Sequence, residues 1–264
     1  MWATLTLLTV LGVTPAQEEM QLTNARVTYG ILGPARPDSK YVPGDTCFLT
    51  FDIEGLTKQG GIMRYGMKME LLDSKEKLKF SRSTEGSDIV DILGGTSVPG
   101  FAHAFIGLDT EPGEYTLKLT VTDQVSKKVQ LLVRKFQVTP KDFGLVGVNT
   151  TYEGRVPAPP IVVIGQPLVL TFGIVGFERD AKTKQPRIEL KMNVLDETGK
   201  STQPKPITEI IGKNVDEKES IISPAFDLAL TRAGKFTIEL TATDTLNKKT
   251  STVMLPLIVL SRPK

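Results

Sequence analysis

The sequence is poor in the side chains that most often carry chemistry, with one cysteine, one histidine and one tryptophan in 264 residues. Because Cys47 is alone, no internal disulfide can form, and the burial of apolar side chains must hold the fold together. A zinc site needs several Cys or His ligands. A Cys–His or Ser–His catalytic site would have to use His103. We therefore expect neither an enzyme nor a bound cofactor.

The charges are nearly balanced, with 32 basic and 30 acidic residues. Proteins that capture nucleic acid electrostatically carry runs of Lys or Arg interleaved with aromatic residues. This sequence has no such run. We therefore expect no nucleic-acid partner.

Calcium is harder to exclude from composition, because it needs only oxygen ligands. Asp123 and Asp244 recur in the same sequence context, each after a predicted strand and before a turn. Neither has the spacing of a calcium-binding loop. We interpret both as aspartates that cap a turn by accepting backbone hydrogen bonds.

The first 16 residues contain no charged side chain and hold an apolar block from Trp2 to Val13. This block is shorter than the roughly 20 residues that a membrane-spanning helix needs. A small-residue cleavage site follows it, so residues 1–16 are predicted to be a secretory signal peptide. A short apolar strand or a membrane tether is the alternative. We expect an exported protein (periplasmic, cell-surface or extracellular) with no membrane span after cleavage.

Three segments of the sequence recur about 121 residues further along the chain. The pairs are 43–56 with 164–177, 113–128 with 234–249, and 65–73 with 188–196. The first two pairs share an offset of 121 and are identical at 6 of 14 and 8 of 16 positions. An internal repeat of this kind indicates two copies of one fold in tandem. We predict a first domain at residues 21–138 and a second at 143–260.

Apolar and polar residues alternate within the repeated segments, as in the run that holds Leu49, Phe51 and Ile53. This period of two is typical of half-buried antiparallel strands. Gly, Pro, Asp and Asn clusters separate the strands, and no stretch shows a helical period. We predict an all-β fold of two tandem immunoglobulin-like antiparallel β-sandwiches. The short connection 139–142, which contains a proline, favours a semi-rigid end-to-end arrangement.

Tyr115 lies where immunoglobulin-like sandwiches have a corner tyrosine, two residues before a core position that is Leu117 in this chain. The second copy has Phe236 at the matching place and lacks the hydroxyl. The core tryptophan is missing from both copies. The domains are therefore similar to disulfide-free bacterial immunoglobulin-like or fibronectin III-like sandwiches.

The chain as a whole resembles a family of exported bacterial proteins, abundant in planctomycetes, that carry two immunoglobulin-like domains behind a signal peptide. The resemblance covers most of the chain after the first 16 residues. It rests on segments such as VTYGILGPARPDSKYVPGDTCFLTFDIEGLT and GKFTIELTATD. No established activity accompanies this family, so the resemblance implies a fold and export but no functional residues.

Cys47 and His103 are the residues with the most chemical potential. Alternation places Cys47 on an inward strand face and His103 beside Phe101 and Phe105 on one face of another strand. At the 121-residue offset the counterpart of His103 is Pro224, so the shared fold does not need a histidine there. We interpret the pair as a core cysteine and a structural or surface histidine.

The sequence favours a non-enzymatic interaction or structural protein of the cell envelope, whose partner is an unknown protein or a cell-surface polymer. Contacts would fall on loops or along an exposed sheet edge. A carbohydrate-binding or adhesion module is the alternative, with Tyr41, Tyr65 and Tyr152 as possible ligand contacts, beside Tyr29. A loop-presenting protease inhibitor and an enzyme with a carboxylate site between the domains are further alternatives. Specific function is expected where the two copies differ.

Overall fold

A computed structural model describes residues 19–263 of the chain. The predicted signal peptide, residues 1–16, lies outside the described residues. The regular elements are β-strands, apart from one short 3₁₀ helix at Glu153–Arg155. The prediction of an all-β fold is confirmed.

The first half of the molecule (residues 19–138) is formed by two sheets. One sheet has three antiparallel strands in the order β1 (Gln21–Thr28), β3 (Thr46–Glu54) and β7 (Ser97–Phe105). The other has the order β2 (Lys40–Tyr41), β9 (Val129–Val138), β8 (Gly113–Asp123), β5 (Ile62–Leu72) and β4 (Lys58–Gln59), and β6 (Leu78–Val90) also pairs with β5. Strands β6 and β7 therefore each end a sheet.

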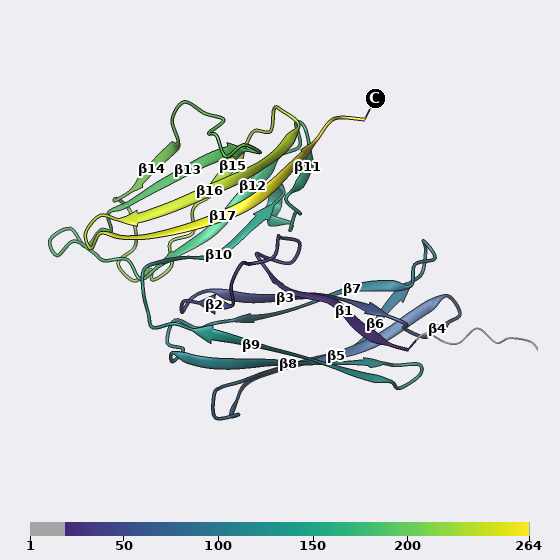
Figure 1. The fold of residues 1–264 in the computed structure, drawn as a ribbon. Coiled ribbons are helices and arrows are strands. Elements are labelled where there is room, and N and C mark those ends of the chain that lie inside the picture. Colours follow the sequence, from purple (N-terminus) through teal and green to yellow (C-terminus); the bar gives the residue numbers. More distant parts are fainter. Residues whose placement is uncertain (1–18, 264) are drawn as a thin grey trace, which may run out of the picture.

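The second half (residues 143–263) also has a three-stranded and a larger sheet, with strands in a similar order (Figure 1). Its three-stranded sheet has the order β10 (Gly144–Thr151), β12 (Leu168–Val175) and β15 (Ala225–Leu228). Its five-stranded sheet has the order β11 (Ile161–Val163), β17 (Lys249–Leu260), β16 (Gly234–Asp244), β13 (Ile188–Asp196) and β14 (Ile207–Ile211). In each half one short strand joins the larger sheet in parallel, β2 on β9 and β11 on β17.

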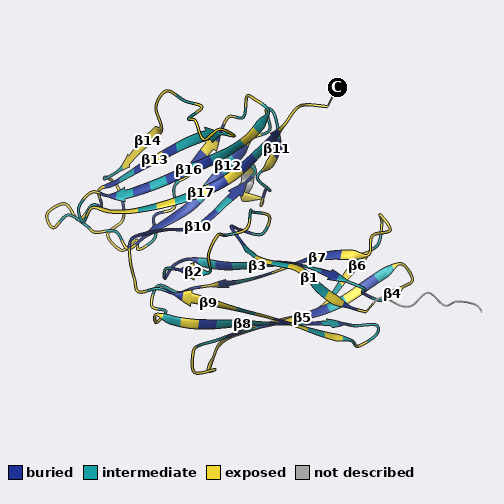
Figure 2. Cartoon of the chain, viewed as in Figure 1, coloured by how far each residue is buried: buried dark blue, intermediate teal, exposed yellow. Residues whose placement is uncertain are grey.

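Each half has its own hydrophobic core between its sheets. Burial alternates strictly along β3, where Cys47, Leu49, Phe51 and Ile53 point inward (Figure 2). The first core draws its buried residues from Met20 to Val138, and the second from Phe143 to Val259 together with Tyr29. Each fully buried aliphatic side chain contributes about 1.5–3 kcal/mol relative to exposure. That the halves are copies of one domain stays a prediction.

Asp123 and Asp244 make matching contacts at the ends of β8 and β16. Asp123 accepts backbone hydrogen bonds from Val125 and, across the sandwich, from Thr57. Asp244 accepts the equivalent bonds from Leu246 and Glu178. Both aspartates are fully buried. The turn-capping interpretation is confirmed, and each carboxylate also fixes a second loop.

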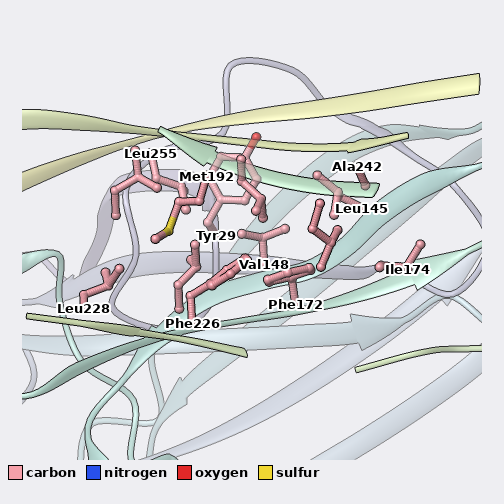
Figure 3. Close-up of a cluster of buried hydrophobic side chains, with 14 of the residues drawn as sticks. Tyr29, Leu145, Val148, Phe172, Ile174, Met192, Phe226, Leu228, Ala242 and Leu255 are labelled. Carbon is pink, nitrogen blue, oxygen red and sulfur yellow. The ribbon is translucent and has the colours of Figure 1, made fainter. Parts of the chain in front are cut away.

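The two halves lie against each other and not end to end (Figure 1). The side chain of Tyr29, which follows β1, is buried in the second core (Figure 3). The amide of Gly147 in β10 donates a 2.9 Å hydrogen bond to the carboxylate of Asp45 at the start of β3. The end-to-end expectation is wrong because it considered only the length of the 139–142 connection, and these contacts come from other segments.

Candidate functional site

A cleft of about 760 Å³ opens in the first half, where the ends of β6 and β7 face each other. We call it the first cleft. Buried lining residues include Ala104, Ile106 and Phe136. Phe80 of β6 and Phe105 of β7 also line it, but their side chains are 46% and 59% exposed. The first cleft therefore combines an apolar interior with two accessible aromatic rings.

Basic side chains border the first cleft. Lys79 is held by Asp73 through a 3.1 Å ion pair. Arg82 and His103 also line the cleft, and neither side chain has a hydrogen bond or ion pair with a described residue. An uncommitted guanidinium beside exposed aromatic rings suits a ligand with apolar groups and a carboxylate.

The free edges of β6 and β7 flank the same cleft. Strand β6 is 13 residues long and largely exposed (Figure 2). Among the described strands it pairs only with β5, and β7 pairs only with β3. Edge strands of this kind present unpaired backbone N–H and C=O groups that can accept another extended chain.

Phe101, His103 and Phe105 form an aromatic strip on the outer face of β7. The His103 ring stacks on Phe101 at 6.5 Å and lies 5.6 Å from Phe48 on the neighbouring strand. His103 pairs across the sheet with Phe48, whereas Cys47 pairs with Ala104 on the inner face. Cys47 and His103 therefore lie on opposite faces of one sheet and do not meet. Burial raises the pKa of the Cys47 thiol, as expected for a core cysteine.

The second half has a corresponding cleft of about 480 Å³ between β13, β14 and β15, which we call the second cleft. Strand register shows which residues correspond. Ala104 pairs with Cys47, and Leu228 pairs with Leu168. The matching offset on these edge strands is therefore 124 residues, three more than the 121 that relates Cys47 to Leu168.

The shift in register corrects the sequence comparison of His103 with Pro224. At an offset of 124, Asp227 occupies the place of His103, since Asp227 pairs with Val169 as His103 pairs with Phe48. The offset returns to 121 at β8 and β16, because the first half has eight residues between Ala104 and Gly113 and the second has five between Leu228 and Gly234, so the first half has three extra residues in this loop. Sequence identity could not locate this insertion, because the edge strands share no motif.

The corner before β8 and the one before β16, each next to a cleft, are stabilised by different contacts. In the first half the Tyr115 hydroxyl donates a 3.0 Å hydrogen bond to the carbonyl of Glu111, so the predicted tyrosine corner is confirmed. In the second half Arg232 occupies the position that corresponds to Glu111. Its guanidinium lies 5.2 Å from the centre of the Phe236 ring. A cation–π contact thus takes the place of the missing hydroxyl.

The tyrosines proposed from the sequence as ligand contacts are differently placed. Tyr41 is 1% exposed in the first core, and its hydroxyl has no hydrogen-bond partner among the described residues. The Tyr41 prediction is therefore wrong, because the two-residue strand β2 turns its ring inward. Tyr65 is half-buried against the first core. Tyr152 packs on the second core and lines a groove of about 530 Å³ between the halves.

A buried charge cluster fixes the halves beside that groove. The Arg36 guanidinium lies 5.0 Å from the ring centre of Tyr29 and 4.2 Å from that of Tyr41, so it bridges the second core and the first. It forms an ion pair with the buried Asp45 and donates a 2.8 Å hydrogen bond to its carboxylate, which also accepts the hydrogen bond from the Gly147 amide. Burial alone would lower the pKa of Arg36, but the charge and hydrogen bond of Asp45 raise it.

Sequence reasoning missed this cluster and the roles of Phe80 and Arg82. Arg36 and Asp45 lie in a loop without periodicity, so no pattern linked them. For the aromatic strip a signal existed, since Phe101 and Phe105 alternate with Gly100, Ala102 and Ala104. Small residues on the inner face and aromatic residues on the outer one indicate an exposed apolar surface.

Residues 19–263 offer neither a metal-binding cluster nor a membrane-spanning helix. No group of three or more His, Cys, Asp or Glu side chains there could hold a metal ion. In the same part of the chain, no helix is both long and apolar enough to cross a bilayer.

Comparisons with known proteins do not identify a family for this chain. No family model and no curated protein matches the sequence. Among solved structures, red sea bream transglutaminase aligns with 92% of this chain at 9% sequence identity and a TM-score of 0.29. The chain spans 31% of that transglutaminase. A similarity this low gives no basis for transferring an activity, so the all-β fold itself is what the structure establishes.

Proposed function

We propose that this protein is a non-enzymatic, exported interaction protein of the cell envelope, and that its first cleft binds an extended segment of a partner protein. The observation that carries the proposal is the coincidence of two free strand edges, two exposed phenylalanines and the unpaired Arg82 at one cleft. The edges would supply backbone hydrogen bonds, while the aromatic rings and Arg82 would select side chains.

The contrast with the second cleft supports this assignment. Ala229 follows Leu228 as Phe105 follows Ala104, so the exposed ring is missing from the second cleft. Leu228 also fills space that Ala104 leaves open. A ligand that needs both volume and an aromatic contact would therefore use the first cleft.

The placement of the two most reactive side chains favours a binding role over catalysis. Cys47 is buried, and His103 stacks on aromatic rings on the opposite face of the sheet. A nucleophile and its base must lie within hydrogen-bonding reach of each other.

Photo-crosslinking in the native cell envelope tests the binding site. A photoreactive phenylalanine derivative placed at position 105 should give one dominant protein adduct, and the same group at Ala229 should give none. Arg82→Glu should abolish the adduct at position 105 if a carboxylate of the partner binds there. Equal labelling from both positions, or no adduct from either, would overturn the proposal.

Export rests on residues 1–16 and is tested separately. Fractionation followed by intact-mass measurement should find a chain that begins at Gln17 in the envelope or the medium. A chain of full length that stays in the cytoplasm would contradict both the signal peptide and the envelope role.

A carbohydrate ligand is the second candidate, because Phe101 and Phe105 give the exposed aromatic face that Tyr41 and Tyr65 do not. A glycan array distinguishes the two. Binding to defined glycans that is lost in Phe101→Ala would favour a sugar ligand over a protein segment.

A further inference from the structure

The loop between β6 and β7 carries two bulky apolar side chains at its tip. Ile92 is 83% exposed and Leu93 is 96% exposed. The next two residues are Gly94 and Gly95, and a Cβ atom built on either would meet nothing within 4 Å. The tip is therefore convex and stands clear of the rest of the fold.

The base of the loop is braced. The ammonium group of Lys58 binds the carboxylate of Asp91, and it also donates a 3.0 Å hydrogen bond to the carbonyl of Gly95. The amide of Asp91 donates to the carbonyl of Gly61 at 3.0 Å. Both shoulders of the loop are thus tied to the β4–β5 hairpin, and Ile92 and Leu93 are held away from the core.

The chain enters the fold at this same end. Gln21 pairs with Glu54 on β3, and Glu54 pairs with Ser97 at the foot of the loop. Neighbouring strands are about 4.8 Å apart, so Gln21 and Ser97 are separated by roughly 10 Å. The described part of the chain therefore begins beside the apolar tip. Figure 1 shows the start of β1 and strand β4 at one end of the first half.

Two lysines lie near the base of the tip, and the charge of one, Lys58, is matched by Asp91. The Thr57 amide donates to Asp123, which brings the β8–β9 turn next to Lys58. That turn carries Lys127, whose side chain is exposed. Convex apolar side chains near lysines are suited to a bilayer surface, where acyl chains need no matching cavity and anionic headgroups attract the charge.

We propose that Ile92 and Leu93 insert into the interfacial layer of a lipid bilayer, so that this end of the first half rests on the membrane without crossing it. A protein pocket is the competing occupant for two adjacent apolar anchors. The bilayer is favoured because the two side chains stand on a convex tip near the exposed Lys127, which suits an anionic surface better than a closed pocket. The first cleft lies at the opposite ends of β6 and β7, so it would face away from the membrane. The proposal does not rest on the function proposed for that cleft.

Vesicle sedimentation tests the proposal directly. The test uses a chain that begins at Gln17, which retains every core residue that the structure describes. With vesicles of phosphatidylcholine and phosphatidylglycerol, the paired change Ile92→Ser and Leu93→Ser should lower the partition coefficient at least about tenfold. Ile210→Ser is the matched control, because Ile210 is 76% exposed on β14 in the other half. It should leave the partition coefficient unchanged.

A second readout uses the absence of tryptophan after residue 2. In the chain that begins at Gln17, Leu93→Trp provides a single fluorophore at the tip. Its emission should shift to the blue with vesicles and be quenched by brominated acyl chains. No vesicle binding by the parent chain, or equal binding by the loop variant, would overturn the proposal. A photo-crosslink from position 93 to a protein, without vesicle binding, would assign the tip to a protein pocket instead.

Discussion

The first and second clefts occupy the same place in their halves, yet they expose different side chains. In the second half Phe226 points inward and stacks on Phe172 within the core. Its structural counterpart in the first half is Ala102, and the phenylalanines of β7 lie on the outer face. Because side chains alternate between the two faces of a strand, β7 carries its aromatic residues on the outer face, whereas β15 carries Phe226 on the inner one. Corresponding strands thus place their aromatic rings on opposite faces, in the core in the second half and on the accessible surface in the first.

The contact between the halves should show the largest difference in unfolding free energy between corresponding residues. Asp45→Ala leaves Arg36 buried without its counter-ion, and we expect a loss of about 3–5 kcal/mol in the free energy of unfolding. Gln166 stands 121 residues later, where it accepts one hydrogen bond from Val163. Gln166→Ala should cost about 1 kcal/mol. Urea titrations followed by circular dichroism measure both, and equal losses would remove the distinction.

The cores offer a comparison of matched leucines. Leu49 and Leu170 are both fully buried on the inner faces of β3 and β12. Replacing either with alanine should cost about 2–5 kcal/mol through lost burial and the cavity left behind. Hydrogen exchange should report lost amide protection mainly in the half that carries the change. Identical loss across both halves in either variant would mean that the molecule unfolds as one unit.

Acid should weaken the first half through Asp123. Burial by itself raises the pKa of this carboxyl, but hydrogen bonds from Ser126 and Thr57 outweigh it and hold the pKa at about 2. The lowered pKa stabilises the fold above about pH 4 and is lost as the pH falls toward 2, a contribution of about 2 kcal/mol. Unfolding free energies measured between pH 5 and pH 2 should show this decline. Asp123→Asn should remove it, and an unchanged pH profile in that variant would contradict the assignment.

The corners should show the smallest effect. Tyr115→Phe loses one hydrogen bond and should cost about 0.5–1.5 kcal/mol. Arg232→Ala loses the cation–π contact and should cost about 0.5–1 kcal/mol. Thermal unfolding of the two variants measures both losses of stability. A gain in stability from Phe236→Tyr would show that Arg232 does not replace the hydrogen bond.

Features that depend on local pattern could be predicted from the sequence. The alternation along β3 placed Cys47 and Leu49 in the core, and the spacing around Tyr115 gave the corner. Asp123 could be interpreted as a turn cap because one backbone partner, Val125, lies two residues away. In each case the deciding contacts are close in sequence or follow the period of a strand.

Features that depend on contacts between distant segments could not be predicted. Tyr41 was expected at the surface, but a two-residue strand is too short to show which face is buried. The pairing of His103 with Phe48 requires the register of β7 on β3, and that register differs from the one between β15 and β12. The bridge from Arg36 to both Tyr29 and Tyr41 needs the orientation of the halves, which the connection 139–142 does not encode.

The position of Tyr29 has a consequence for biosynthesis. Its ring leaves the ribosome before any residue of the second half has been made, yet it completes the second core. The segment around it must therefore be held in place by the first half when the later strands arrive. Cutting the gene at the connection would give a C-terminal fragment with a hole the size of a phenol ring. Translation therefore supplies Tyr29 before the strands whose core it completes.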